Sequence, residues 1–199
     1  MPESHRSELT ALVGSRICHD LISPLGAIGN GLELLQLSGL AQSPEMALIA
    51  ESVEHAHARI RFFRIAYGHA DDVQVVRGSE MRAVLRAMFH GSRVRVDWLP
   101  DDQPRSEAKL AFLILQCLET AMPYGGEIDV QDSHSGREIK ARAERLVLDS
   151  GLWATLSDPA DFGGLRPAQV QFGLLAEQVQ TSRRRLQIDL GETEISVLI

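Results

Sequence analysis

The chain has 199 residues, of which 44% are hydrophobic, and it carries a formal net charge of −7 at pH 7. This length allows one domain or two small ones, and the acidic balance excludes the basic face that nucleic-acid binding requires. The longest apolar run, residues 110–115, is far below the ~20 residues that cross a bilayer, and the polar N-terminus lacks the apolar core of a signal peptide. We therefore expect a cytoplasmic protein that binds neither nucleic acid nor membrane.

A helical hairpin is predicted for residues 1–72. Apolar residues in the segment 6–38 recur at steps of four and three, which is the spacing of one face of a helix. Ser43 followed by Pro44 is a helix-start signal, and a second apolar repeat follows it. The two repeats predict two helices joined by a short turn.

Each helix of this hairpin has one long apolar seam, and two helices alone cannot bury both seams fully against each other. A four-helix bundle is the usual solution. Since the chain has only one such hairpin, the missing pair most simply comes from a second copy related by two-fold symmetry. We predict a homodimer.

The pattern changes to shorter elements in residues 78–199. Helices are predicted at 79–90, 105–122 and 167–182, and strands at 93–99, 127–131, 138–143, 185–190 and 194–198. Helices and mostly antiparallel strands in this order favour a two-layer α/β sandwich. The predicted fold class is therefore α+β: an N-terminal helical hairpin that forms a dimeric four-helix bundle, followed by this sandwich.

His19 is the residue in the first helix that points to chemistry. The 100° step of a helix places it well over a right angle from the apolar seam, so it faces solvent. Imidazole titrates near neutral pH and is a nucleophile towards phosphorus when it is held in position. The same face of the helix carries Arg16, Ile22, Ser23, Gly26 and Asn30. Its side chains near His19 are mostly small, which lets another protein approach closely.

Residues 19–25, HDLISPL, resemble the phosphoacceptor box of sensor histidine kinases, a His-acid-x-x-x-Pro pattern on the first helix of a dimeric hairpin. The longer string at 19–35, HDLISPLGAIGNGLELL, with the altered second unit, resembles the ChpT-type dimeric histidine phosphotransferases of bacterial phosphorelays. The resemblance implies that His19 carries the phosphoryl group. It implies that Asp20 orients or deprotonates the imidazole and that Arg16 contacts the phosphoryl group or an acidic partner. Docking of the partner is assigned to Ile22, Ser23, Gly26 and Asn30, although kinases usually have a polar residue at the position of Ile22.

The second unit resembles a degenerate kinase ATP-binding domain. The stretch 115–126 is similar to the Asn-rich helix of kinases and its exit, but Thr120 stands where the magnesium-binding Asn would be, and Gln116 replaces the preceding Asn. A hydroxyl is a poor substitute for a carbonyl oxygen in the octahedral shell of Mg²⁺. Only remnants of the glycine-rich boxes stand at 149–151 and 163–164, so we expect no ATP binding.

The sequence thus predicts a histidine phosphotransferase of a two-component phosphorelay, which moves a phosphoryl group between receiver-domain aspartates through His19 without hydrolysing ATP. Expected partners are a second copy of the chain, response-regulator receiver domains and the receiver of a hybrid histidine kinase. The acidic pocket of the receiver would supply Mg²⁺, so no cofactor or metal is expected on this chain. Two alternatives stay open: an ATP-dependent histidine kinase with a diverged nucleotide site, and a non-catalytic dimeric module that binds receivers.

Overall fold

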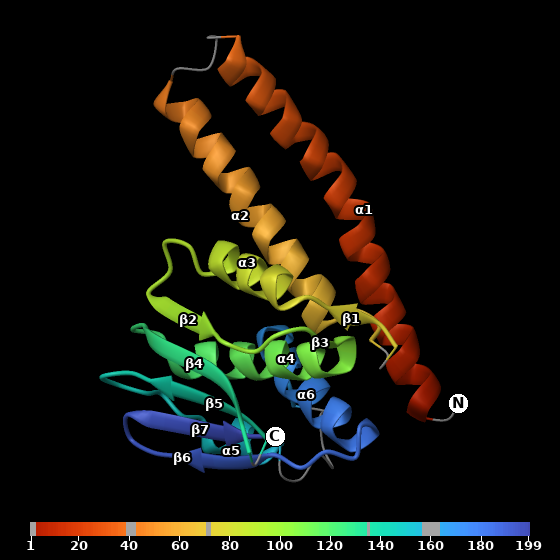
Figure 1. The fold of residues 1–199 in the computed structure, drawn as a ribbon, viewed down its shortest axis with the longest axis vertical. Coiled ribbons are helices and arrows are strands. Elements are labelled where there is room, and N and C mark those ends of the chain that lie inside the picture. Colours follow the sequence, from red (N-terminus) through yellow and green to blue (C-terminus); the bar gives the residue numbers. More distant parts are fainter. Residues whose placement is uncertain (1–2, 39–42, 71–72, 135, 157–163) are drawn as a thin grey trace.

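A computed structural model of the chain describes residues 3–38, 43–70, 73–134, 136–156 and 164–199. Two long helices rise from a mixed unit of helices and strands (Figure 1), and they are α1 (Glu3–Leu37) and α2 (Pro44–Ala66). The unit beneath them comprises, in chain order, β1 (Val75–Val76), α3 (Gly78–Met88), β2 (Val94–Trp98), β3 (Gln103–Pro104), α4 (Arg105–Ala121), β4 (Gly126–Ser133), β5 (Gly136–Arg142), α5 (Ser150–Ala154), the 3₁₀ turn η1 (Pro167–Gln169), α6 (Val170–Thr181), β6 (Gln187–Leu190) and β7 (Glu194–Leu198).

The predicted helical hairpin is present, and α1 packs against α2. Ser43 caps α2, as its sequence signal predicts, because its Oγ accepts a hydrogen bond from the amide of Met46 at 3.3 Å. The helix α1 continues through Pro24. Within the described residues, no helix has both the length and the apolar content needed to cross a bilayer.

The second unit contains a five-stranded sheet in the order β2-β4-β5-β7-β6. Only β2 and β4 are parallel within this sheet, so the predicted mostly antiparallel character is confirmed. Ile128, Ala141 and Ile195 face one another across three strands and are fully buried. Helices α4 and α6 lie on one side of the sheet (Figure 1), as the two-layer prediction requires.

The base of the hairpin belongs to the same hydrophobic core as the sheet. Phe62, Ile65 and Ala66 of α2 are almost completely buried and join the cluster that contains α4. The rings of Phe62 and Phe112 lie 4.8 Å apart, centroid to centroid. Helix α4 is therefore buried on several sides at once, which explains its nearly uniform apolar sequence. The division at 1–72 and 78–199 stays a prediction, and the core is continuous across it.

Several short elements were not predicted. The two-residue strands β1 and β3 pair only with each other, and the five residues of α5 carry too little periodicity to read. The helix expected from residue 167 begins as the turn η1 before α6. The strand expected from residue 185 begins two residues later, at Gln187. The main elements of the prediction are otherwise in place, with ends that differ by a few residues.

Candidate functional site

His19 lies on α1 with its side chain 85% exposed, as its position on the helix predicts. Its Nδ1 lies 3.2 Å from a carboxylate oxygen of Asp20, and the other oxygen of Asp20 accepts a hydrogen bond from Nε of Arg16 at 2.7 Å. An ionised carboxylate only accepts hydrogen bonds, so the proton in the His19 contact lies on Nδ1. The lone pair of Nε2 is then available to an electrophile.

The carboxylate of Asp20 is held in its ionised form. The hydrogen bond from Arg16 is the main cause that lowers the pKa of Asp20, and the contact with His19 lowers this pKa further. Both neighbours stand on the same exposed stretch of helix, where solvent weakens each interaction. The contacts among Arg16, Asp20 and His19 therefore favour one imidazole tautomer on an exposed surface.

The other predicted site residues lie along the same side of α1. Ile22 is half-buried, while Ser23 and Asn30 are exposed. Gly26 and Asn30 line a groove of about 680 Å³ between the two hairpin helices. Other residues that line this groove are Glu33 of α1 and Glu54, His57 and Arg61 of α2. We call His19, Ile22, Ser23, Gly26 and Asn30 the docking face.

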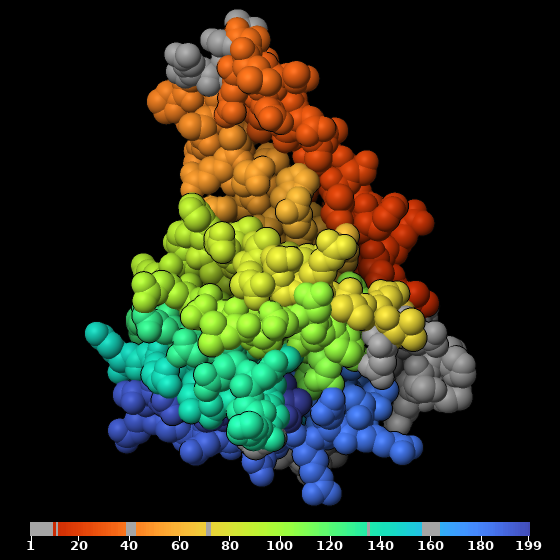
Figure 2. Space-filling model, in the orientation of Figure 1, coloured from red at the N-terminus to blue at the C-terminus, as the bar shows by residue number. Residues whose placement is uncertain are grey.

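A second surface of α1 is apolar and uncovered. It consists of five side chains that are 40–54% exposed, and we call it the open stripe: Val13, Ile17, Leu21, Ile28 and Leu35. His19 and Leu21 are two residues apart and thus point about 160° away from each other around the helix. The docking face and the open stripe are therefore separate surfaces, and the upper part of the hairpin rises clear of the second unit in Figure 2.

Two glycines of α1 illustrate the difference between packing and open space. A Cβ added to Gly14 would lie 3.1 Å from the carbonyl oxygen of Tyr67, so the close approach of α1 to the end of α2 explains this glycine. A Cβ added to Gly26 would meet no atom within 4 Å. Glycine costs a helix about 1 kcal/mol relative to alanine. No contact within this chain explains why Gly26 is kept in the helix despite that cost.

A hydrogen-bonded junction beneath His19 escaped prediction. Ser15, one turn before His19, accepts a hydrogen bond from the amide of His69 at 3.0 Å. The carbonyl of His69 in turn accepts a hydrogen bond from Nε of Arg105 at 2.9 Å. Two cations one turn apart, Arg105 and Lys109, stand in the first turns of α4, just before its apolar run, and these charges are the sequence signal for the junction.

Two of the residues that resemble remnants of a nucleotide site, Thr120 and Asp149, have structural partners. The hydroxyl of Thr120 accepts a hydrogen bond from Gln171 of α6 at 3.0 Å. Asp149 caps α5 by accepting a hydrogen bond from the amide of Leu152 at 3.1 Å. Gly164 is exposed, and Gly163 lies outside the described residues.

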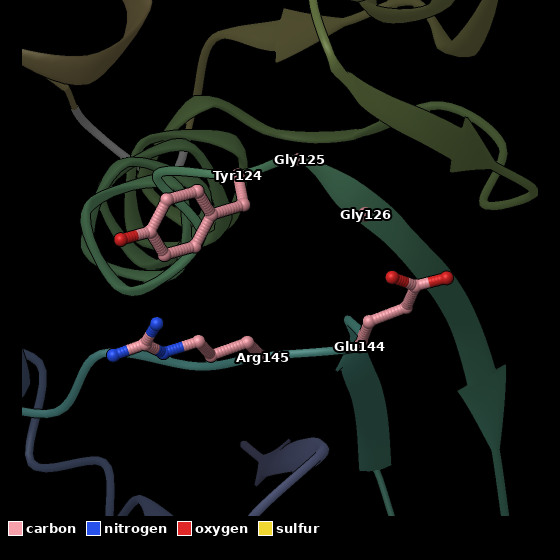
Figure 3. Close-up of a pocket in the computed structure, with 5 residues that line it drawn as sticks. All are labelled: Tyr124, Gly125, Gly126, Glu144 and Arg145. Atoms are coloured by element: carbon pink, nitrogen blue, oxygen red, sulfur yellow. The ribbon is translucent and has the colours of Figure 1, made fainter.

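A hollow of about 620 Å³ lies at the exit of α4, where Figure 3 shows Tyr124 facing Arg145. The guanidinium of Arg145 lies 5.3 Å from the centre of the Tyr124 ring. Gly125 and Gly126 line this hollow and have φ values of 99° and 152°. A Cβ on either glycine would lie within 2.5 Å of a backbone oxygen of a neighbouring segment, so close chain packing accounts for both.

Known proteins resemble this chain in both sequence and fold. Residues 78–194 match the family model described as the histidine phosphotransferase C-terminal domain. The chain is also 36% identical over 186 residues to the protein phosphotransferase ChpT of Brucella abortus (strain 2308), with 86% of each protein covered. The chain belongs to the histidine phosphotransferase family.

The fold of this family member agrees with that assignment. A bacterial phosphotransferase solved at 1.7 Å superposes with a TM-score of 0.62 at 28% identity, over 92% of this chain and 91% of that one. The family resemblance, the α+β fold class and the histidine phosphotransferase function predicted from the sequence are confirmed. The family model begins at residue 78, so the roles of individual hairpin residues stay predictions.

Proposed function

We propose that His19 is the phosphoacceptor of this phosphotransferase and passes the group between receiver-domain aspartates. The observation that carries this proposal is the contact of His19 Nδ1 with Asp20 on an exposed helix face. It leaves Nε2 as the free nucleophile and directs it away from the chain's own core. A protein whose phosphoacceptor is this exposed needs a partner to exclude water from the reaction.

In the forward step, Nε2 of His19 attacks the phosphorus of an aspartyl phosphate in line. The Nε2–P bond forms while the bond from phosphorus to the aspartate oxygen breaks, which returns a free carboxylate to the receiver. The proton on Nδ1 stays in place, so the imidazole becomes cationic. Asp20 stabilises that charge, and the reverse sequence with a second receiver completes the relay.

We further propose that the docking face and its groove bind the receiver. The open space above Gly26 allows a partner helix to approach the α1 backbone closely. Response regulators of two-component signalling are the partner class that follows from the family, and the receiver of a hybrid kinase is the proposed phosphate donor. In this scheme the receiver holds the Mg²⁺, and the present chain supplies no ligand to it.

The open stripe supports a homodimer. Five apolar side chains on one side of α1 are about half exposed, and Leu48 and Ile49 of α2 are exposed as well. A second copy related by two-fold symmetry would cover these side chains and complete a four-helix bundle. The docking face would stay outside that bundle. We also propose that the protein is cytoplasmic.

The ATP-dependent alternative is disfavoured by the position of Thr120. Its hydroxyl accepts a hydrogen bond from Gln171 of α6 and donates one to the carbonyl of Gln116. These bonds occupy the hydroxyl at the position where the kinase resemblance places a metal ligand. We therefore propose that the second unit works without nucleotide.

The first experiment measures transfer from a radiolabelled receiver domain to the full chain, with His19→Ala and an ATP-only reaction in parallel. We expect label on the wild type, none on His19→Ala, and none from ATP alone. His55→Ala is the matched control, because His55 is another solvent-accessible histidine of the hairpin and also lies near a carboxylate, 4.0 Å from Glu51. Label from ATP would identify a kinase. Binding of receivers without any label on the wild type would identify the non-catalytic module.

A further inference from the structure

The chain turns beneath the His19 region of α1 at a point where three elements meet. A Cβ added to Gly68 would lie 2.3 Å from the carbonyl oxygen of Arg64, 3.2 Å from Oγ of Ser15 and 3.3 Å from Nη2 of Arg105. These atoms belong to α2, α1 and α4. The turn therefore has no room for a side chain at residue 68, and the hairpin meets the second unit there in direct contact.

Arg105 ties this turn to two carbonyl oxygens. Its Nε donates to His69 at 2.9 Å, and its Nη2 donates to Arg64 at 2.6 Å. The last carbonyls of a helix have no partner within the helix, and cations stabilise that negative end. Arg105 thus fastens the C-terminal end of α2 to the first turn of α4.

The same turn is bound from the other side by α1. The amide of His69 donates to Oγ of Ser15 at 3.0 Å, so residue 69 is held by Ser15 through its N–H and by Arg105 through its C=O. Lys109 is 9% exposed and donates to the carbonyl of Gly68 at 3.1 Å, and burial lowers its pKa. Burying an ammonium group costs free energy. Lys109 is thus a second cation bound to this turn, and its burial costs free energy.

We propose that Arg105 is a positioning residue for phosphoryl transfer, which acts through His69 and Ser15 to hold the His19 turn of α1 at a fixed angle to the second unit. This inference rests on the proposed role of His19. Ser15 lies one helical turn from His19, about 6 Å along the axis. A receiver of about 100 residues has a radius of gyration near 13 Å. A receiver docked at His19 therefore extends past Ser15 towards the second unit, and the junction prearranges both surfaces.

The test compares transfer kinetics of Arg105→Ala with the wild type, using a radiolabelled receiver domain as phosphodonor. Loss of prearrangement weakens docking, so we expect KM for the receiver to rise about five- to tenfold. The kcat at saturating receiver and the labelling of His19 by phosphoramidate, which needs no docking, should stay unchanged. A lysine cannot bind two carbonyls as the guanidinium fork does, so Arg105→Lys should give an intermediate KM.

Arg142→Ala is the matched control, because Arg142 also makes two short ion pairs, to Asp129 and Glu194, on the sheet. Its KM should equal that of the wild type. A folded Arg105→Ala with wild-type KM overturns the inference. If Arg105→Ala does not fold, Ser15→Ala decides, because it removes only the hydroxyl acceptor: a raised KM supports the inference and an unchanged KM overturns it.

The wild-type reaction separates this inference from the proposed function. If His19 of the wild type is labelled and the kinetics of Arg105→Ala and Ser15→Ala equal those of the wild type, only the role of Arg105 is contradicted. No transfer to the wild type from any receiver contradicts the proposed role of His19 and this inference together.

Discussion

Gln171 on α6 donates a hydrogen bond to the hydroxyl of Thr120 on α4 across 3.0 Å. The same hydroxyl donates to the carbonyl of Gln116 at 2.9 Å, so it has both a donor and an acceptor partner. Gln171 is 6% exposed and also donates to the carbonyl of Ala168 at 3.2 Å. This small network joins two helices at the position where the kinase resemblance places a metal-binding amide.

The Thr120 network leads to a prediction about nucleotide binding. We expect MgATP to give no thermal stabilisation of the wild type, since a ligand that binds the folded state raises its stability. Thr120→Asn should not restore binding, because Gln171 still lies against that position. Differential scanning fluorimetry with MgATP checks both proteins. A rise in Tm of the wild type with MgATP would favour the kinase alternative.

The open stripe predicts the oligomeric state. Leu21→Glu places a charge in the proposed dimer interface, where burial of an unpaired carboxylate is costly, so we expect dissociation to monomers. Leu12→Glu is the control, since Leu12 is 50% exposed but lies about 180° from Leu21 around α1. Light scattering coupled to size-exclusion chromatography reports the mass. A monomeric wild type would remove the basis for the dimer.

Gly26→Ala should raise stability and lower activity at once. The added methyl group meets no atom of this chain within 4 Å, so helix propensity alone predicts a gain of about 0.5–1 kcal/mol in the free energy of unfolding. The same methyl group protrudes into the groove that Gly26 and Asn30 line, where the receiver is proposed to bind, so KM for the receiver should rise severalfold. Gly31→Ala is the control for the docking face: its Cβ also meets no atom within 4 Å, and it lies about 140° from Gly26 around α1, beside Ile28 and Leu35 of the open stripe. Denaturant unfolding and transfer kinetics test the pair, and an unchanged KM for Gly26→Ala would contradict the assignment of Gly26.

Asp20→Asn tests how the carboxylate assists His19. Loss of the charge that stabilises the cationic imidazole should lower the transfer rate by about tenfold or more, the equivalent of one hydrogen bond to a charged group. Asp20 has a lowered pKa in the folded protein, caused first by Arg16, so its contribution to stability is present at neutral pH and is lost as pH falls through this lowered pKa. The difference in Tm between Asp20→Asn and wild type should therefore be small at pH 7 and vanish in strong acid. An Asp20→Asn variant with the wild-type transfer rate would assign the carboxylate a purely structural role.

The sequence predicted what local signals encode. The capping role of Ser43 and the exposure of His19 each follow from a residue and its near neighbours. The burial of Phe62 does not follow from such local signals, because its partner Phe112 is 50 positions away and a helix that buries two faces shows only one clear apolar seam. The junction was missed for a related reason: Arg105 binds backbone carbonyls, and a carbonyl acceptor has no sequence signature.

Asp149 shows that one short motif can fit two interpretations. A carboxylate followed by Ser-Gly resembles part of a nucleotide box, yet it is an ordinary helix cap in the structure. Short motifs of this kind recur because turns and caps draw on the same few residue types. The partner that a residue meets in space decides between the two interpretations.

The wide angle between His19 and Leu21 on one helix has an evolutionary consequence. In the proposed arrangement, substitutions on the side of His19 would change which receiver is recognised, while the side of Leu21 would keep its apolar character and the dimer. Duplicated copies of the gene would then acquire different partners and still form the same dimer.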